Sequence, residues 1–281
     1  MSIVGYDNPG GLAQLSPSIW DNCPKTLLND KGFGVFVFEN FQTPVAISTT
    51  VDSVPFGRGD FSFKGDTDTS INSVDDSESG IVDVETNNTA GDAGVFVANA
   101  FAKIVLNSGN PVWFEALVAP GDVDDDMGTF IGLVEEDGAD EDVIADDPAS
   151  NTSTANVSLI GFFQNNGDAN AYNAIYKNDT DTAVEVLADV TNATAIDSGS
   201  RVSLIDGVAA TLAGFHKLGI TFDGRDKLKF WVDGINVATQ VVDSTVDQTN
   251  FLAPIVAVKT GDSQAEKIFV GFIACAYQTL H

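Results

Sequence analysis

The sequence predicts an all-β protein, a two-sheet antiparallel β-sandwich preceded by an irregular N-terminal arm. Short apolar segments with a two-residue alternation recur along the chain, separated by turns rich in Gly, Asp and Asn, which is typical of sandwiches and barrels. The 19 Phe and 26 Gly residues agree with this fold, because Phe fills the space between facing sheets and Gly supplies turns. A single domain can account for the 281 residues, since all-β domains commonly reach about 250 residues.

Residues 1–40 are expected to form the irregular arm. Gly and Pro interrupt this segment too often for regular elements, as at Asn8-Pro9-Gly10-Gly11 and Cys23-Pro24. The arm also carries apolar residues that could dock it on a surface, either that of its own sandwich or that of a neighbouring subunit. These docking candidates are Ile19, Trp20, Leu27 and Leu28.

Residues 41–281 are expected to form the sandwich, with long acidic loops between its strands. Residues 112–118 form one predicted strand, and residues 129–134 form the next. The clearest pattern follows, because apolar side chains alternate along 217–222 and again along 228–233. The Asp233-Gly234 pair after them predicts a tight hairpin turn, since Gly tolerates the positive φ that such turns need.

The charge balance excludes some partners. The chain has 41 Asp and Glu residues against 13 Lys and Arg, a formal net charge of -28. Nucleic acids and anionic membranes are therefore not expected as partners, because both require a basic surface. No apolar run approaches the roughly 20 residues of a membrane helix, and the first residues do not resemble a signal peptide. We expect synthesis in a reducing cytoplasm, with Cys23 and Cys275 outside any disulfide framework.

One acidic turn is a candidate metal site. Asp122, Asp124 and Asp126 stand at alternate positions, and carboxylates are the hard oxygen ligands that Ca²⁺ prefers. A solvated acidic turn without metal is the alternative. Apart from this Ca²⁺, the sequence predicts no cofactor.

Three aromatic residues are candidate carbohydrate contacts, because sugar sites combine aromatic rings with polar groups. They are Trp231, Tyr172 and Tyr176. Trp231 lies on the strand face opposite Phe230, so it either faces solvent or packs between the sheets.

A catalytic set is not evident in the sequence. The two histidines are His216, at the start of a predicted strand, and the terminal His281, and no Gly-x-Ser-x-Gly motif accompanies them. The acidic run 135–141 contains Gly and lacks the alternating apolar residues of a strand that aims paired carboxylates into a cleft. The sequence thus predicts that the chain is not an enzyme.

The segments 215–224 and 228–237, Phe-His-Lys-Leu-Gly-Ile-Thr-Phe-Asp-Gly and Leu-Lys-Phe-Trp-Val-Asp-Gly-Ile-Asn-Val, resemble a known hairpin. It is the strand, turn and Phe-x-Val-Asp-Gly-x-x-Val hairpin of concanavalin A-like and laminin-G-like jelly rolls. The resemblance covers roughly residues 90–281 and implies a jelly-roll sandwich.

The whole chain also resembles jelly-roll structural proteins of tailed phages, through its acidic composition and its irregular arm. This resemblance implies a non-enzymatic virion protein, a capsid decoration or cement protein that stabilises the particle surface. Its partners would be the major capsid protein or other virion proteins and copies of itself, with a trimer expected, and its location the capsid surface. The alternative is a lectin-like, carbohydrate-binding module of a phage tail, fibre or head that attaches to surface glycans.

Overall fold

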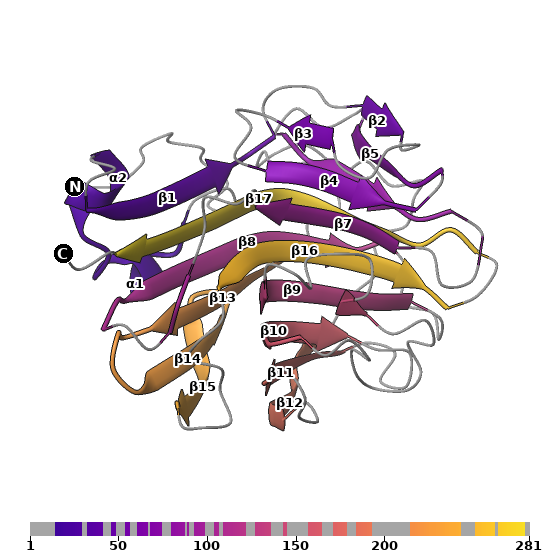
Figure 1. Cartoon of the computed structure of the whole chain (residues 1–281). Helices are drawn as coiled ribbons and strands as arrows, with labels where there is room; N and C mark the ends of the chain where they lie inside the picture. The colour runs from indigo at the N-terminus through magenta and orange to yellow at the C-terminus, as the bar shows by residue number, and fades with distance from the viewer. Residues whose placement is uncertain are drawn as a thin grey trace, which may run out of the picture.

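The computed structural model shows two antiparallel sheets packed face to face, with two short helices at one end (Figure 1). The described residues are 15–29, 33–41, 46–48, 54–56, 61–66, 68–74, 80–87, 89, 93–98, 104–106, 109–121, 127–135, 143–144, 157–164, 171–178, 184–192, 214–242, 251–261 and 264–278. This arrangement confirms the predicted fold class.

The first sheet has nine strands among the described residues, in the order β15-β14-β13-β8-β17-β6-β5-β2, with β1 also paired to β17. Their bounds are β1 Gly34–Glu39, β2 Ala46–Ser48, β5 Ser70–Ser73, β6 Val82–Glu85, β8 Val112–Pro120, β13 His216–Phe222, β14 Lys227–Val232, β15 Ile235–Val241 and β17 Lys267–Gln278.

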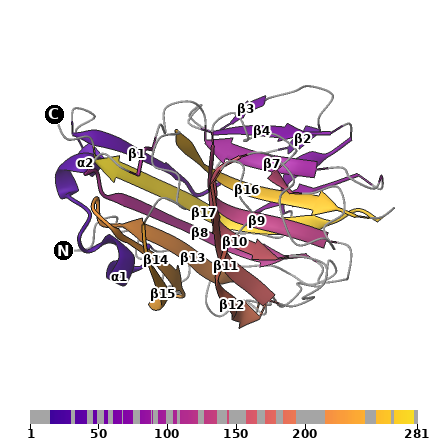
Figure 2. The same cartoon turned by 60° about the horizontal axis from the view of Figure 1, so that its bottom comes forward.

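The second sheet has eight described strands, in the order β12-β11-β10-β9-β16-β7-β4-β3. Their bounds are β3 Val54–Phe56, β4 Phe61–Gly65, β7 Ala93–Ala98, β9 Met127–Glu135, β10 Leu159–Gln164, β11 Ala171–Lys177, β12 Val184–Asn192 and β16 Leu252–Thr260. Its edge strand β12 contacts β15 of the first sheet, and Figure 2 shows these strands beside each other.

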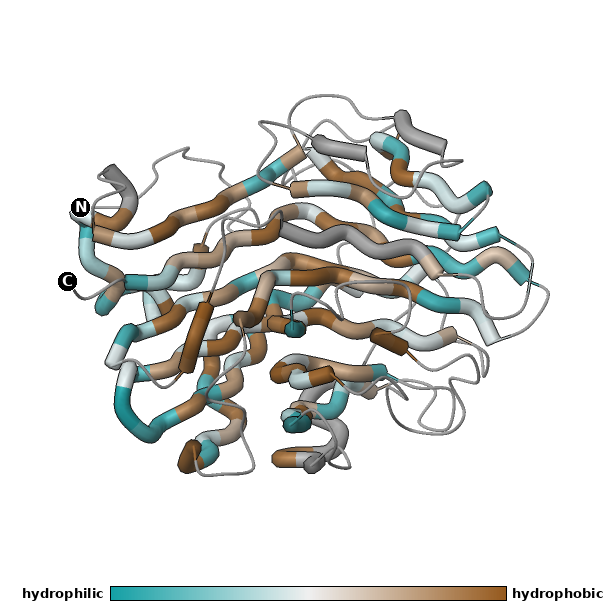
Figure 3. Tube along the Cα trace, in the orientation of Figure 1, coloured by the Kyte–Doolittle hydropathy of each residue, from teal (hydrophilic) through white to brown (hydrophobic). Residues whose placement is uncertain are grey.

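The main core lies between the sheets, because alternate residues of each strand point inward. Phe162 on β10 and Phe230 on β14 meet edge to face across the two sheets, with ring centroids 5.7 Å apart. Figure 3 shows the same alternation as brown segments interrupted by pale and teal ones along the strands. Two smaller clusters cover the outer faces of the nine-stranded and the eight-stranded sheet.

The predicted strands at 217–222 and 228–233 are present as β13 and β14, and β15 follows the predicted turn. Asp233 and Gly234 both have positive φ, 50° and 77°, as the two central residues of a type I′ turn require. The sequence therefore predicted this part of the sheet, including its turn.

The arm differs from the expectation. Its described part contains helix α1, Pro17–Trp20, and helix α2, Lys25–Asn29, and residues 34–39 already form strand β1 of the sheet. Pro17 opens α1 as a first-turn residue, where its missing N–H costs nothing. The boundary predicted at residue 40 is thus too late, because β1 pairs along β17.

The docking candidates of the arm pack on their own chain. Ile19, Trp20 and Leu27 are each 2% exposed and belong to the cluster on the outer face of the nine-stranded sheet. Leu28 lies in α2, and its side chain is outside the described residues. Of the two alternatives, packing on the same sandwich is the one observed for the three described side chains.

Both cysteines are free and buried. Burial raises the pKa of the Cys23 thiol to about 12. Within the described residues no helix has the length and apolar character needed to cross a membrane.

Candidate functional site

The outer face of the nine-stranded sheet carries a groove that the strand register explains. Lys229, Thr221 and Trp113 stand side by side on β14, β13 and β8. Side chains two residues apart on a strand point to the same face of the sheet. The next row on this face is therefore Trp231, Gly219 and Glu115.

The groove contains a pocket of about 350 Å³. One side is built by the α1–α2 segment, and the floor and opposite side come from strand ends and the turn after β13. The lining residues are Ser18, Ile19, Asn22, Pro24, Pro111, Trp113, Thr221, Phe222, Asp223, Lys227, Lys229, Trp231 and Gln278. The pocket therefore combines two indole rings with hydroxyl, amide, ammonium and carboxylate groups.

Trp231 is held in place at the pocket. Its Nε1 donates a hydrogen bond to the Thr221 hydroxyl at 2.9 Å, and the Lys229 ammonium lies 5.8 Å from the ring centroid. A cation in this position is attracted by the ring's negative face. The indole and the lysine are thus presented together as one amphipathic surface.

Asp223 fixes the turn at the end of the pocket. Its Oδ1 accepts backbone N–H groups from Arg225, Asp226 and Lys227 at 2.9, 3.0 and 3.1 Å. Desolvation acts to raise the pKa of this carboxyl, but the three backbone hydrogen bonds and the Lys227 charge outweigh it and lower the pKa. The carboxylate is ionised at neutral pH and stabilises the turn.

Helix α1 is bound to the sheet through Glu115. The Oε2 atom of this fully buried carboxyl accepts the Ser16 N–H at 2.9 Å and the Trp20 Nε1–H at 2.8 Å. Burial raises the pKa of Glu115, opposed by these hydrogen bonds and by the Lys217 charge. Its Oε1 atom has no partner among the described residues.

Gly219 makes room for the helix. A Cβ atom on this residue would stand 2.5 Å from the Ile19 Cδ1 atom, well inside van der Waals contact. The absence of a side chain therefore lets α1 lie directly on the sheet and form the wall of the pocket.

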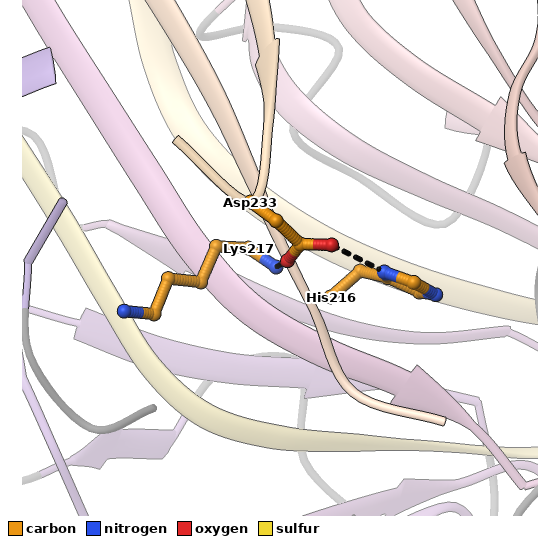
Figure 4. Close-up of polar contacts among 3 residues, drawn as sticks. All are labelled: His216, Lys217 and Asp233. Carbon is orange, nitrogen blue, oxygen red and sulfur yellow. Dashed lines mark hydrogen bonds and ion pairs between the residues drawn. The ribbon is translucent and has the colours of Figure 1, made fainter. Parts of the chain in front are cut away.

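His216 belongs to a structural contact at the end of the same hairpin. Its Nδ1 lies 2.9 Å from Asp233 Oδ2, and Asp233 Oδ1 accepts the Lys217 N–H at 2.9 Å (Figure 4). Desolvation acts to raise the pKa of Asp233, but the His216 and Lys217 hydrogen bonds and their charges lower it overall. The interaction joins the β14–β15 turn to the start of β13, as expected for a residue at a strand edge.

A pair of acids lies elsewhere on the nine-stranded sheet. Asp83 and Glu85 alternate with the buried Val82 and Val84 on β6, so both carboxyls are on the outer face. Burial, helped by the Glu85 charge, raises the pKa of Asp83 against the opposing effects of Lys267 and Asn72. Lys267 Nζ lies 3.4 Å from Glu85 Oε1.

The predicted carbohydrate contacts are separated by the structure. Trp231 lines the pocket on the outer face, so it does not pack between the sheets. Tyr172 and Tyr176 are 0% and 4% exposed in the core, and their rings cannot stack on an external sugar. These two candidates are corrected: both faces of β11 are buried, and alternation alone does not show which face a ligand reaches.

The predicted calcium turn falls on residues that the structure leaves undescribed. Asp122, Asp124 and Asp126 lie in the interval between Gly121 and Met127, so this site stays a prediction. In the part of the chain that is described, no group of three or more His, Cys, Asp or Glu side chains could hold a metal ion.

The sequence did not single out Trp113, Thr221, Lys227 and Lys229 as pocket residues. Alternation along the strand places Lys229 and Trp231 on one face, so the sequence could have predicted that these two side chains lie together. The pairing of Thr221 with Trp113 could not be predicted, because it depends on the register between strands about 100 residues apart in the sequence.

Sequence comparisons identify no relative. No protein-family model matches the chain, and no curated protein matches it either.

Solved structures share the fold. A protein of unknown function from Shewanella oneidensis MR-1 has a TM-score of 0.53 at 11% identity, over 88% of this chain and 87% of that one. A laminarinase catalytic domain, an endo-1,3-β-glucanase from Thermotoga petrophila RKU-1, has a TM-score of 0.51 at 10% identity over 86% and 97%. A Zobellia galactanivorans protein in complex with laminaritriose and laminaritetraose has a TM-score of 0.52 at 10% identity over 87% and 99%.

These structures confirm the concanavalin A-like jelly roll and contradict the predicted function. The fold is that of glucan-degrading enzymes, and none of the three structures is described as a particle component. The expectations of a capsid decoration protein and of a chain that is not an enzyme are therefore wrong. At such low identity the likeness shows the fold alone, so the activity must be argued from this chain's own residues.

Proposed function

We propose that this chain is a carbohydrate-active protein that binds a polysaccharide in the groove between helix α1 and the β13–β14 hairpin. The observation that carries the proposal is the pocket of about 350 Å³, where the partly exposed Trp231 ring lies beside polar side chains and the largely buried Trp113 completes the lining. Its size lies within the roughly 300–1,000 Å³ of small-ligand sites.

The pocket's chemistry suits a sugar ring. A pyranose has apolar C–H faces and a rim of hydroxyl groups, and indole rings offer apolar area with a polar edge. Asn22 and Gln278 supply amides, and Thr221 and Ser18 supply hydroxyls around the two rings. The rigid strand positions of Trp113 and Trp231 also limit the entropy lost on binding.

The solved neighbours suggest the first ligand to test. One is an endo-1,3-β-glucanase and another was solved with laminari-oligosaccharides, which makes a 1,3-β-glucan such as laminarin the starting point.

Binding is tested by isothermal titration calorimetry and by affinity electrophoresis in gels containing laminarin, mixed-linkage glucan or acidic polysaccharides. Trp231→Ala should weaken binding at least about tenfold, because it removes a wall of the pocket. Phe33→Ala is the matched control, since Phe33 is a 49% exposed aromatic residue outside the pocket lining.

A second variant separates binding from folding. Trp231→Phe keeps a ring but loses the hydrogen bond to Thr221, and it should retain most of the affinity. Equal affinity of wild type and Trp231→Ala, or no binding to any polysaccharide, would refute the proposed site.

Glycan hydrolysis is a second candidate function, favoured by Asp83 and Glu85. Asp83 and Glu85 are same-face neighbours on one strand, with Cα atoms about 6.6–6.8 Å apart, so two carboxyls stand next to each other as in glycosidases. Burial raises the pKa of Asp83, as a general acid requires, and the Lys267 ammonium lies 3.4 Å from the Glu85 carboxyl.

Hydrolysis is measured as release of reducing ends from the same polysaccharides. Asp83→Asn should lower the rate at least about 100-fold, the usual contribution of a general acid, while Glu39→Gln serves as a control on another strand. A wild-type protein that releases no sugar would exclude this second candidate and leave the binding proposal standing.

A further inference from the structure

Positive charge is concentrated in the β13–β14 hairpin that borders the pocket of an otherwise acidic protein. Four of the 13 basic residues fall between positions 217 and 229, namely Lys217, Arg225, Lys227 and Lys229. Residues 217–233 contain three acidic residues, so this hairpin has a net charge of +1, whereas the whole chain has -28. The rest of the molecule therefore has a net charge of -29, and the hairpin differs from it in carrying a small net positive charge.

Two of these lysines line the pocket, and one of them is not neutralised there. Lys227 and Lys229 both contribute to the lining. Asp223, the pocket's carboxylate, uses one oxygen for three backbone N–H groups of its own turn, and its charge is balanced by the nearby Lys227. Within the described residues the Lys229 ammonium has only the Trp231 ring as a partner.

From this charge distribution we propose that the groove binds an acidic polysaccharide, one whose sugars carry a carboxylate or a sulfate group. The inference rests on the proposed carbohydrate-binding function and specifies its ligand. The anion lies between the ammonium groups of Lys229 and Lys227, while the sugar ring packs against Trp231. An ammonium group binds such anions through charge-assisted hydrogen bonds, which are about twice as strong as neutral ones.

The negative charge of the remaining molecule does not prevent this contact. At physiological ionic strength the Debye length is about 8 Å, so a bound anion responds mainly to the charges of the hairpin itself. Distant carboxylates slow the approach of a polyanion at low salt more than they weaken the bound state.

The test compares the affinities of laminarin, polygalacturonate and κ-carrageenan, which are neutral, carboxylated and sulfated. The wild-type protein should bind at least one acidic polysaccharide about tenfold more tightly than laminarin. Whether polygalacturonate or κ-carrageenan binds identifies the anion as carboxylate or sulfate.

Variants of Lys229 assign the preference to the pocket. Lys229→Ala should reduce the affinity for the acidic ligand about tenfold and that for laminarin less than twofold, and Lys229→Arg should keep the preference. Arg225→Ala is the matched control, because it removes one positive charge from the same hairpin outside the pocket lining.

The outcomes separate this inference from the function on which it rests. If laminarin binds as tightly as the acidic polysaccharides and Trp231→Ala abolishes binding, the acidic preference is wrong and the sugar site stands. A loss in Arg225→Ala equal to that in Lys229→Ala would show general charge attraction and overturn the inference. No binding to any of the three polysaccharides would refute both.

Discussion

Replacing Glu115 with alanine should release helix α1 from the sheet. The substitution removes the acceptor of the Ser16 N–H and the Trp20 Nε1–H. Each buried donor left without an acceptor costs about 1–3 kcal/mol, so keeping α1 docked would cost about 2–6 kcal/mol. Releasing α1 instead exposes Ile19 and Trp20, which costs about 1.5–3 kcal/mol per side chain. The two costs are similar, and we expect a stability loss of about 3–5 kcal/mol together with partial opening of α1.

Glutamine at the same position should behave differently. Its side-chain carbonyl can accept both hydrogen bonds, so Glu115→Gln should cost only about 1 kcal/mol, the scale of one neutral hydrogen bond. Because the pKa of Glu115 is raised, its contribution to stability is fully present below the ordinary glutamate value of 4.5 and is lost as pH rises through the folded-state pKa. The stability advantage of wild type over Glu115→Gln should therefore be greatest in acid and shrink toward pH 8.

Urea unfolding at several pH values measures the stability loss, and hydrogen exchange of residues 15–29 measures the opening of α1. Glu85→Gln is the control, since its side chain is 34% exposed and lies on another strand. Equal losses in the alanine and glutamine variants, or unchanged exchange of α1 in Glu115→Ala, would refute the role assigned to these two hydrogen bonds.

Three further changes test other parts of the structure. Gly132→Ala should cost more than about 3 kcal/mol in urea unfolding, because its Cβ atom would overlap a backbone carbonyl oxygen of β10. Asp233→Asn should reduce stability only above about pH 4: the pKa of Asp233 is lowered, so its contribution is lost as pH falls through the folded-state pKa. Cys23 and Cys275 are 3% and 2% exposed, so a thiol reagent should label neither in the native protein and both in urea.

The sequence predicted local features well. The strands at 217–222 and 228–233 follow from alternation, and their turn follows from an Asp-Gly pair whose two residues both have positive φ. The residues that make up each of these patterns lie within a few positions of one another, so the structure they predict depends only on local interactions.

The pocket depends on contacts that no local signal encodes. Its floor requires β8 to pair with β13, and its wall requires α1 to lie over Gly219. The polar segment before residue 89 also concealed the acid pair, because Val82–Glu85 forms a strand there only by pairing with β5 and β17. Tyr172 failed as a candidate for a different reason: its strand is buried on both faces.

The outer faces of the two sheets differ in how their residues are covered, and this difference favours the nine-stranded sheet as the ligand-binding surface. On the eight-stranded sheet, Gly132 and Gly161 face each other across β9 and β10. The neighbouring Phe130 and Phe163 are buried, with Val143 in the same apolar cluster.

The centre of that face is buried in an apolar cluster, whereas the nine-stranded sheet presents ammonium, hydroxyl and amide groups beside two indoles in the pocket. Polysaccharide binding should therefore be sensitive to Trp231→Ala and insensitive to Phe163→Leu, which keeps the apolar packing. The reverse result would place the ligand on the eight-stranded sheet and would require the covering residues to move when it binds.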